Sequence, residues 1–249
     1  MTVHQHEPRL ELGLGLIGIG RPWPTDESEV PSEEAVDELL QYAVGRGVRF
    51  FDTAAAYGDS ERRLGRFLRR MSTADRDAVT VSTKVGETWS TSSGSAVDHA
   101  TAALERSLDR SFELLGRIDV LQVHKCTAEV LGRRSVVRWL EAVKHDRVPT
   151  LGASVSTTSD LEAVLSADLF DYVQFPANAR RREFADVFVQ TAPARITPIL
   201  NRPLASGALA HTSDPFRFLR ETFSSGVVLS GTTSRDHLDA NIASFSGAA

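Results

Sequence analysis

Four polar side chains in the first half of the chain could together carry out a proton transfer: Asp52, Tyr57, Lys84 and His124. Each lies at the end of a short apolar run or in the loop just after one. Taken singly, each has an ordinary explanation, such as a helix cap, a solvated lysine or a half-buried ring. Their common placement at the ends of successive apolar runs is what suggests a joint role.

A tyrosine hydroxyl is a weak acid near neutral pH, because its pKa is about 10. An adjacent ammonium group stabilises the phenolate and lowers that pKa, and a carboxylate beyond it holds the ammonium in place. Asp52, Lys84 and Tyr57 would supply such a chain. His124 could hydrogen-bond the same substrate oxygen and assist proton delivery. The set predicts protonation of an oxygen on which negative charge develops, as when hydride adds to a carbonyl.

The elements that must position these residues alternate between short apolar runs and longer stretches with helical periodicity, which is typical of an α/β fold. The expected strands cover residues 14–20, 48–52, 79–83, 118–124, 150–154, 172–175, 196–200 and 227–230. The expected helices cover about 33–46, 60–70, 96–115, 134–145, 158–166, 181–191, 214–223 and 235–245. The stretch 88–95, rich in Ser, Thr and Gly, is expected to be a loop. Eight strands alternating with eight helices predict one closed (β/α)8 TIM barrel over residues 1–249, with an open doubly wound sheet as the alternative.

The amino-acid composition argues against nucleic acid and anionic membranes as binding partners. Lys+Arg 28 against Asp+Glu 33 gives a net charge of −5, without the clustered positive charge that nucleic acid or an anionic membrane requires. The single cysteine, Cys126, cannot form an intrachain disulfide or a thiolate metal site, and no metal is expected. Residues 1–9 lack the order of a signal peptide, so we expect a soluble cytoplasmic protein.

Residues 13–18 match the G-x-G-x-x-G dinucleotide fingerprint letter for letter. That fingerprint requires a strand before its first glycine and a helix under its last. Here the apolar run coincides with the glycines, and Pro22 and Pro24 follow where a helix should continue. The segment is therefore interpreted as the first barrel strand.

Three motifs surround the four polar residues: FDTAAAYGDSERRLG at 51–65, TKVG at 83–86 and IDVLQVH at 118–124. In this order they resemble the aldo-keto reductases. The resemblance implies a barrel without a Rossmann domain and an NADPH molecule extended across its carboxyl-terminal face. It also implies a tetrad in which Tyr57 is the acid and Lys84, Asp52 and His124 assist.

The same resemblance implies contacts with the cofactor farther along the chain. Ser154 and Gln174 would hold the nicotinamide carboxamide, and a segment after the seventh strand would cover the pyrophosphate through Arg202, Pro203, Leu204 and Ser206. The last segment would bind the 2′-phosphate adenosine end through Gly231, Thr232, Thr233, Ser234, Arg235, His237 and Asn241. Hydroxyls and N–H groups at a helix start can hold an anion, although a simple helix cap also explains the hydroxyls of 232–234.

The sequence departs from the family pattern at Val155, Asn201 and Ala240, where members often have an asparagine, an aromatic ring and an acidic residue. The loops that commonly close the substrate pocket, and the segment after the last helix, are short. We therefore expect a less tightly held cofactor and a more open pocket. Its expected walls are Trp23, Trp89 and Cys126.

The first functional hypothesis is an NADP-dependent oxidoreductase that uses NADPH to reduce a small-molecule aldehyde or ketone to an alcohol. The second is an NADPH-binding regulatory barrel with little turnover. The third is a cofactor-free acid–base catalyst, such as a dehydratase or isomerase, on the same barrel. NADPH binding separates the third hypothesis from the first two, and turnover separates the first from the second.

Overall fold

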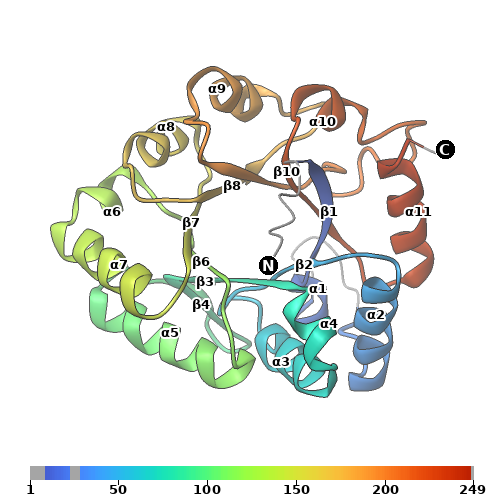
Figure 1. The fold of residues 1–249 in the computed structure, drawn as a ribbon, viewed down its shortest axis with the longest axis horizontal. Helices are drawn as coiled ribbons and strands as arrows, with labels where there is room; N and C mark the ends of the chain where they lie inside the picture. The colour runs from blue at the N-terminus through green and yellow to red at the C-terminus, as the bar shows by residue number, and fades with distance from the viewer. Residues whose placement is uncertain (1–8, 23–28, 248–249) are drawn as a thin grey trace, which may run out of the picture.

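Eight parallel strands close into a barrel surrounded by helices in the computed structural model, which describes residues 9–22 and 29–247 (Figure 1). The barrel strands are β1 (Leu10–Gly15), β2 (Phe50–Asp52), β3 (Thr80–Val85), β6 (Val120–Val123), β7 (Thr150–Ser154), β8 (Tyr172–Pro176), β9 (Thr197–Asn201) and β10 (Gly226–Gly231). Their order around the barrel is β1, β10, β9, β8, β7, β6, β3, β2, and β2 pairs back onto β1 with Phe51 opposite Leu14. This closure confirms the (β/α)8 barrel and excludes the open sheet.

The helices form an outer ring around the strands (Figure 1). They are α1 (Ile17–Gly20), α2 (Glu33–Gly45), α3 (Ser60–Arg70), α4 (Thr73–Asp77), α5 (Thr101–Leu115), α6 (Ala128–Gly132), α7 (Arg134–Asp146), α8 (Thr158–Ser166), α9 (Glu183–Thr191), α10 (Arg217–Thr222) and α11 (Arg235–Phe245). Local chemistry fixes several ends: the Ser32 hydroxyl caps α2 by accepting from the Ala35 N–H, and Gly116 ends α5 with φ 78°. Among the described residues, no helix is long and apolar enough to cross a membrane.

The barrel interior changes from apolar to polar along the strands. Alternate residues of a strand point to the same side. One buried cluster comprises Phe50, Val120, Ile199, Val227 and Leu229, with Tyr172 packed against it. Two positions farther toward the carboxyl ends of four of these strands stand Asp52, Gln122, Gln174 and Asn201. An apolar floor therefore underlies a polar layer at the carboxyl-terminal end of the barrel.

The first strand is shifted from its predicted position. β1 covers Leu10–Gly15 and pairs with β10 along its whole length, whereas 14–20 was expected. The residues after it turn into the short helix α1, in which Ile19 is buried. Because apolar residues continue through both elements, hydrophobicity alone does not mark where the strand ends.

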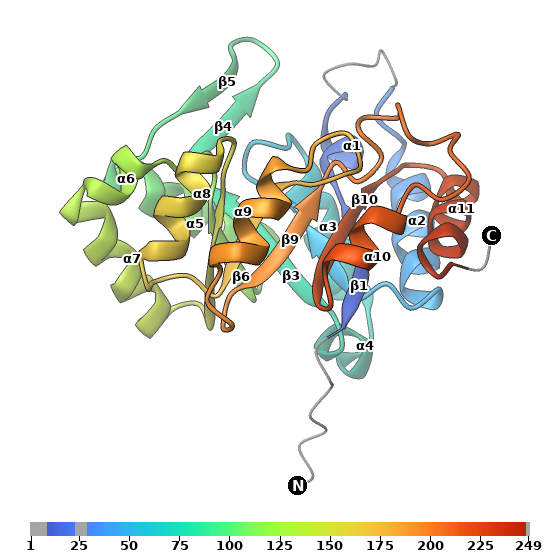
Figure 2. The same ribbon diagram turned by 90° about the horizontal axis from the view of Figure 1, so that it is seen from above.

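The expected loop at 88–95 is a β-hairpin instead. β4 (Glu87–Ser90) and β5 (Gly94–Val97) pair antiparallel, with Trp89 opposite Ser95, and stand out from one end of the barrel (Figure 2). Because β5 occupies residues expected to begin a helix at 96, α5 starts only at Thr101. The hairpin is largely exposed, so it lacks the buried face that produces a readable apolar alternation. The short helices α4 and α6 also lie outside the predicted set.

Candidate active site

The four predicted catalytic residues come together at the carboxyl-terminal end of the barrel. Asp52 ends β2, Lys84 lies near the end of β3, and His124 directly follows β6. Thr83 faces the surrounding helices, where its hydroxyl donates to Glu61 at 2.6 Å, so Lys84 faces the barrel interior and is 1% exposed. Tyr57 reaches the same region from the loop after β2, and its ring centroid lies 4.9 Å from Lys84 Nζ.

Asp52 and Lys84 form a buried ion pair. Lys84 Nζ donates to Asp52 Oδ2 at 2.5 Å and to the Thr53 carbonyl at 2.9 Å. The other oxygen of Asp52 accepts from Gln122 Nε2 at 2.9 Å and from the Ser82 hydroxyl at 3.2 Å. Burial is the largest single influence on Lys84 and lowers its pKa, but Asp52 and Tyr57 together outweigh burial, and the net pKa of Lys84 is raised. The pair therefore keeps a positive charge beside Tyr57.

The pKa of Tyr57 is raised, whereas the charge of Lys84 alone was expected to lower it. Burial raises the pKa of Tyr57, Lys84 lowers it and Asp52 raises it again, and the net direction is upward. The ammonium acts in the expected sense, but desolvation of the phenolate is the larger effect. Tyr57 therefore holds its proton firmly at neutral pH, as a proton donor must before the reaction.

The ring of His124 also contacts Tyr57. The two rings meet edge to face, with centroids 6.0 Å apart and planes at 83°. Burial lowers the pKa of His124 well below its ordinary value, and the charges of Lys84 and Lys125 act in the same direction. His124 is therefore a neutral imidazole near pH 7.

A carboxylate stands behind this imidazole. Glu87, 4% exposed, places Oε2 3.1 Å from Nδ1 of His124, without the geometry of a hydrogen bond, and its Oε1 lies 2.7 Å from Lys125 Nζ. His99 Nε2 donates to the His124 carbonyl at 2.8 Å. Two residues of the segment after β3 therefore contact His124: Glu87 lies beside its ring and His99 binds its carbonyl.

The sequence analysis missed three of these supporting residues: Ser82, Gln122 and Glu87. A signal for two of them was present, because Ser82 and Gln122 stand two positions before Lys84 and His124 and so share their face of the strand. Glu87 offered no comparable pattern, because it lies where the chain leaves the barrel to enter the hairpin.

The residues predicted to hold a nicotinamide ring lie side by side. Ser154 on β7 is opposite Gln174 on β8. Gln174 Oε1 and Asn201 Oδ1 are buried and, among the described residues, have no hydrogen-bond partner. Unsatisfied buried acceptors are unfavourable, and the N–H groups of a carboxamide would satisfy them. These residues therefore fit a nicotinamide carboxamide.

The segment predicted to cover a pyrophosphate begins directly after β9. Arg202, Ala205 and Ser206 have φ values of 53°, 49° and 55°, a conformation that non-glycine residues rarely adopt. Asn178 Nδ2 anchors the segment by donating to the Arg202 carbonyl at 3.0 Å. Pro203 is buried and Leu204 packs against the core, while Arg202 is exposed. The backbone is thus held in a specific succession of turns.

The segment predicted for the adenosine end forms the start of α11. The Ser234 hydroxyl caps the helix by accepting from the His237 N–H at 3.4 Å, and Thr232 Oγ1 accepts from the Ser234 N–H at 3.1 Å. Asn241 is tied to β10, because its Nδ2 donates to the Ser230 hydroxyl at 2.7 Å. Gly231, Thr233 and His237 are exposed. The Ser234 hydroxyl therefore acts as a helix cap, as the simpler interpretation of residues 232–234 predicted.

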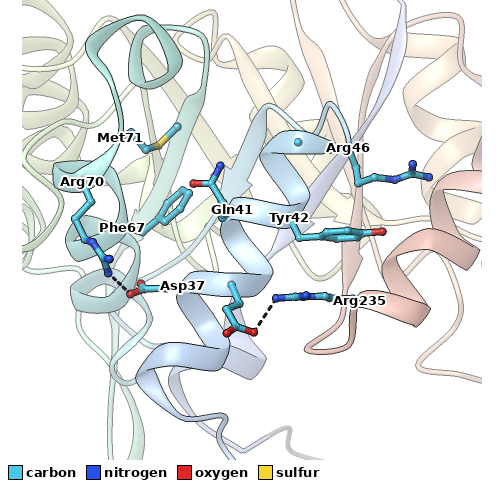
Figure 3. Close-up of a pocket in the computed structure, with 10 residues that line it drawn as sticks. Asp37, Gln41, Tyr42, Arg46, Phe67, Arg70, Met71 and Arg235 are labelled. Atoms are coloured by element: carbon cyan, nitrogen blue, oxygen red, sulfur yellow. Dashed lines mark hydrogen bonds and ion pairs between the residues drawn. The ribbon is translucent and has the colours of Figure 1, made fainter.

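Arg235 lies against the outer wall of the barrel. Its guanidinium pairs with Glu38 at 2.7 Å and its Cζ lies 5.5 Å from the Tyr42 ring centroid (Figure 3). A surface hollow of about 670 Å³ between α2, α3 and α11 includes Arg235 in its lining. Of the site residues predicted from the sequence, Arg235 alone lines this hollow, and none of the four residues predicted to be catalytic does.

The predicted pocket walls have three different outcomes. Trp89 is half-buried on the hairpin, with Arg21 against its ring. Cys126 is fully buried, and burial raises the pKa of its thiol to about 12, so it is a packing residue rather than an open wall. Trp23 lies outside the described residues.

Comparison with known proteins agrees with this geometry. The model of the Aldo/keto reductase family matches residues 11–215. The aldo-keto reductase str7 of Strobilurus tenacellus is 32% identical over 147 residues, which are 58% of this chain, and the match spans 42% of that relative's length. A Pseudomonas aeruginosa structure assigned to the aldo-keto reductases superposes with a TM-score of 0.82 at 28% identity, covering 95% of this chain and 90% of the other.

A second solved structure shares the fold at lower identity. It is an aldo/keto reductase from Klebsiella pneumoniae in complex with NADP and acetate, 19% identical, with a TM-score of 0.67 and coverage of 94% of this chain and 85% of the other. The family model spans most of the chain and includes Asp52, Tyr57, Lys84 and His124 at the strand ends. The chain therefore belongs to the aldo/keto reductase family.

Proposed function

We propose that this protein reduces an aldehyde or ketone to an alcohol with NADPH, and that Tyr57 donates the proton. The observation that carries the proposal is the buried ion pair of Asp52 and Lys84 beside the half-buried Tyr57, with the neutral ring of His124 against the tyrosine. The NADP bound in the related Klebsiella structure supports the choice of cofactor. The unsatisfied acceptors of Gln174 and Asn201 support a carboxamide at the strand ends.

Each residue of the cluster has a defined part in this reaction. NADPH supplies the hydride that forms the new C–H bond at the carbonyl carbon. The carbonyl oxygen becomes strongly basic as it gains negative charge, so it can take the proton that Tyr57 otherwise holds. Lys84 stabilises the phenolate left on Tyr57, and Asp52 keeps Lys84 charged and in place. The products are the alcohol and NADP⁺, and Tyr57 regains a proton from solvent.

His124 contributes by orientation. Because its pKa is lowered well below the ordinary value by burial, it offers a neutral ring to the substrate oxygen rather than a competing charge. A hydrogen bond from this ring would fix the carbonyl between Tyr57 and the nicotinamide. Ser154 and Gln174 would hold the nicotinamide from the opposite side of the barrel end.

The direct test measures NADPH binding and turnover in the same preparation. We expect quenching of tryptophan fluorescence by NADPH, stronger than by NADH, and oxidation of NADPH when a reactive aromatic aldehyde is added. Tyr57→Phe should lower kcat by about 100-fold or more, because general acid catalysis contributes that much, while the Kd for NADPH stays nearly unchanged. Tyr42→Phe on the outer wall is the matched control and should leave kcat unchanged.

Other outcomes point to other functions. NADPH binding without turnover of any aldehyde would indicate a regulatory barrel. The absence of binding by either nucleotide would remove hydride transfer and leave an acid–base catalyst. Unchanged turnover in Tyr57→Phe would disprove the role of Tyr57 as the acid.

A further inference from the structure

Arg21 is fixed beside the proposed proton donor. Gly20 packs so closely on the Tyr57 loop that a Cβ placed on it would lie 1.9 Å from the Tyr57 carbonyl oxygen. A Cβ placed on Gly58 would lie 3.2 Å from the Cβ of Arg21. Pro22 follows and favours an extended backbone for Arg21, which has φ −154° and ψ 160°. The position of Arg21 relative to Tyr57 is therefore set by the backbone.

The Arg21 side chain reaches from this loop to the hairpin. Its Cζ lies 5.3 Å from the ring centroid of Trp89 on β4. The same strand begins with Glu87, whose carboxylate lies beside His124. The charge of Arg21 also acts on His124: after burial and the two lysines, it helps to hold the pKa of His124 low. The charge of the guanidinium therefore acts on His124, while the Arg21 backbone packs against the loop that carries Tyr57.

Arg21 differs from the two lysines near His124, because each lysine has a carboxylate partner and Arg21 has none among the described residues. Lys84 is paired with Asp52, and Lys125 is paired with Glu87. Within residues 9–22 and 29–247, no carboxylate forms an ion pair with Arg21, and its Nε is buried without a hydrogen-bond partner. A buried donor without an acceptor leaves the guanidinium under-satisfied, so an oxyanion that reached its two other nitrogens would gain a charge-assisted hydrogen bond.

We propose that Arg21 binds an anionic group, a carboxylate or a phosphate, on the carbonyl substrate that Tyr57 protonates. This proposal rests on the proposed reductase function and specifies its substrate class. A guanidinium presents a planar array of donors that matches both anions, and its cation–π contact with Trp89 holds the side chain against the hairpin. The anionic group takes no part in the bond changes and serves to place the carbonyl against Tyr57.

The test compares aromatic aldehydes that carry a carboxylate, a neutral ester or a phosphate at the same ring position. These are 4-carboxybenzaldehyde, its neutral methyl ester, and 4-formylphenyl phosphate. We expect the wild-type protein to favour an anionic aldehyde over the ester by about tenfold or more in kcat/KM, as one charge-assisted hydrogen bond provides. The ratio between carboxylate and phosphate identifies which anion fits. Arg21→Gln should abolish the preference, Arg21→Lys should retain part of it, and Arg46→Gln on the outer wall should retain all of it.

A binding measurement makes the result independent of turnover. Terephthalate carries the carboxylates without a reducible carbonyl, and calorimetry should show at least about tenfold weaker binding to Arg21→Gln than to the wild type. Equal use of the charged and neutral aldehydes by the wild type would overturn the proposal and leave the reductase function intact. A loss of NADPH affinity in Arg21→Gln, with the substrate preference unchanged, would also overturn it, because Arg21 would then serve the cofactor phosphates. Terephthalate binding through Arg21 in a protein without reductase activity would retain the anion site and refute the reductase function.

Discussion

Lys84 and Asp52 form an ion pair whose side chains are 1% and 2% exposed, with their charged atoms 2.5 Å apart. Replacing one partner leaves the other charge buried without its counter-charge. We expect Lys84→Met and Asp52→Asn each to lower the free energy of unfolding by about 3–5 kcal/mol. The double variant should lose less than the sum, by roughly 0.5–3 kcal/mol, because no uncompensated charge remains. Urea unfolding followed by tryptophan fluorescence measures all three.

The exposed pair of Arg217 and Glu221 provides the control for this cycle. Its side chains are 71% and 62% exposed, so Arg217→Met and Glu221→Gln should each change the free energy of unfolding by less than about 1 kcal/mol. Strict additivity at Lys84 and Asp52 would contradict the coupling inferred from the geometry.

Removing either of two charged neighbours of His124, Glu87 or Lys125, should shift the pH dependence of the reaction, and the two shifts should be opposite. We expect kcat/KM to fall at acidic pH as His124 becomes protonated. The carboxylate of Glu87 favours the protonated ring and the ammonium of Lys125 opposes it. Glu87→Gln should therefore lower the pKa of His124 and move the acidic limb to lower pH, whereas Lys125→Met should raise the pKa and move the limb to higher pH.

The pH profile of kcat/KM for the three proteins is the measurement. His124→Gln serves as the reference, because it removes the titrating ring and should lose this limb. A shift in the same direction for both charge variants would show that another group controls the limb.

The pairing of Arg235 with Glu38 predicts how coenzyme preference could be changed. Because Glu38 already holds the guanidinium, Arg235→Leu alone should have little effect on NADPH affinity. Glu38→Ala should free Arg235 for the 2′-phosphate and tighten NADPH binding by about fivefold, with no change for NADH, which lacks that phosphate. The double variant should return to the wild-type Kd. Fluorescence titrations with both nucleotides test this, and equal tightening for both would refute a role at the 2′-phosphate.

Cys126 is predicted to be chemically inert in the folded protein. Its side chain is fully buried and its pKa is raised by burial to about 12, so almost no thiolate exists near neutrality. A thiol reagent such as DTNB should react with the urea-unfolded chain, which has one cysteine, and hardly at all with the native protein. Glutathione under the same conditions confirms that the reagent is active, and rapid labelling of native protein would place Cys126 on an accessible surface.

The convergence of Asp52, Tyr57, Lys84 and His124 could be predicted from the sequence for a physical reason. Parallel strands in a barrel bring their carboxyl ends to one side, so polar residues at those ends must converge. Asp52, Lys84 and His124 satisfy that rule, and Tyr57 follows within one loop. Phe50, two positions before Asp52, points to the same side of β2 and belongs to the apolar cluster below the polar layer.

Other features depend on contacts that no local pattern reports. Arg235 meets Glu38 across 197 residues of chain, so its engagement on the outer wall could not be inferred from the helix start. The direction of the Tyr57 pKa depends on how completely the ring is desolvated, which requires the packed structure. The hairpin at 87–97 was missed because it is largely exposed and so lacks the apolar alternation of a half-buried strand.

The tip of the hairpin, unlike Glu87 and Trp89 near its base, is a place where the sequence can change without disturbing the contacts with His124 and Arg21. The turn between Ser90 and Gly94 lies beyond the Trp89 pair, and its residues, 91–93, are exposed. Insertions or randomised segments at this tip would leave the barrel register untouched. The tip is therefore a natural position for evolving or engineering new substrate preferences while the proton-transfer machinery stays constant.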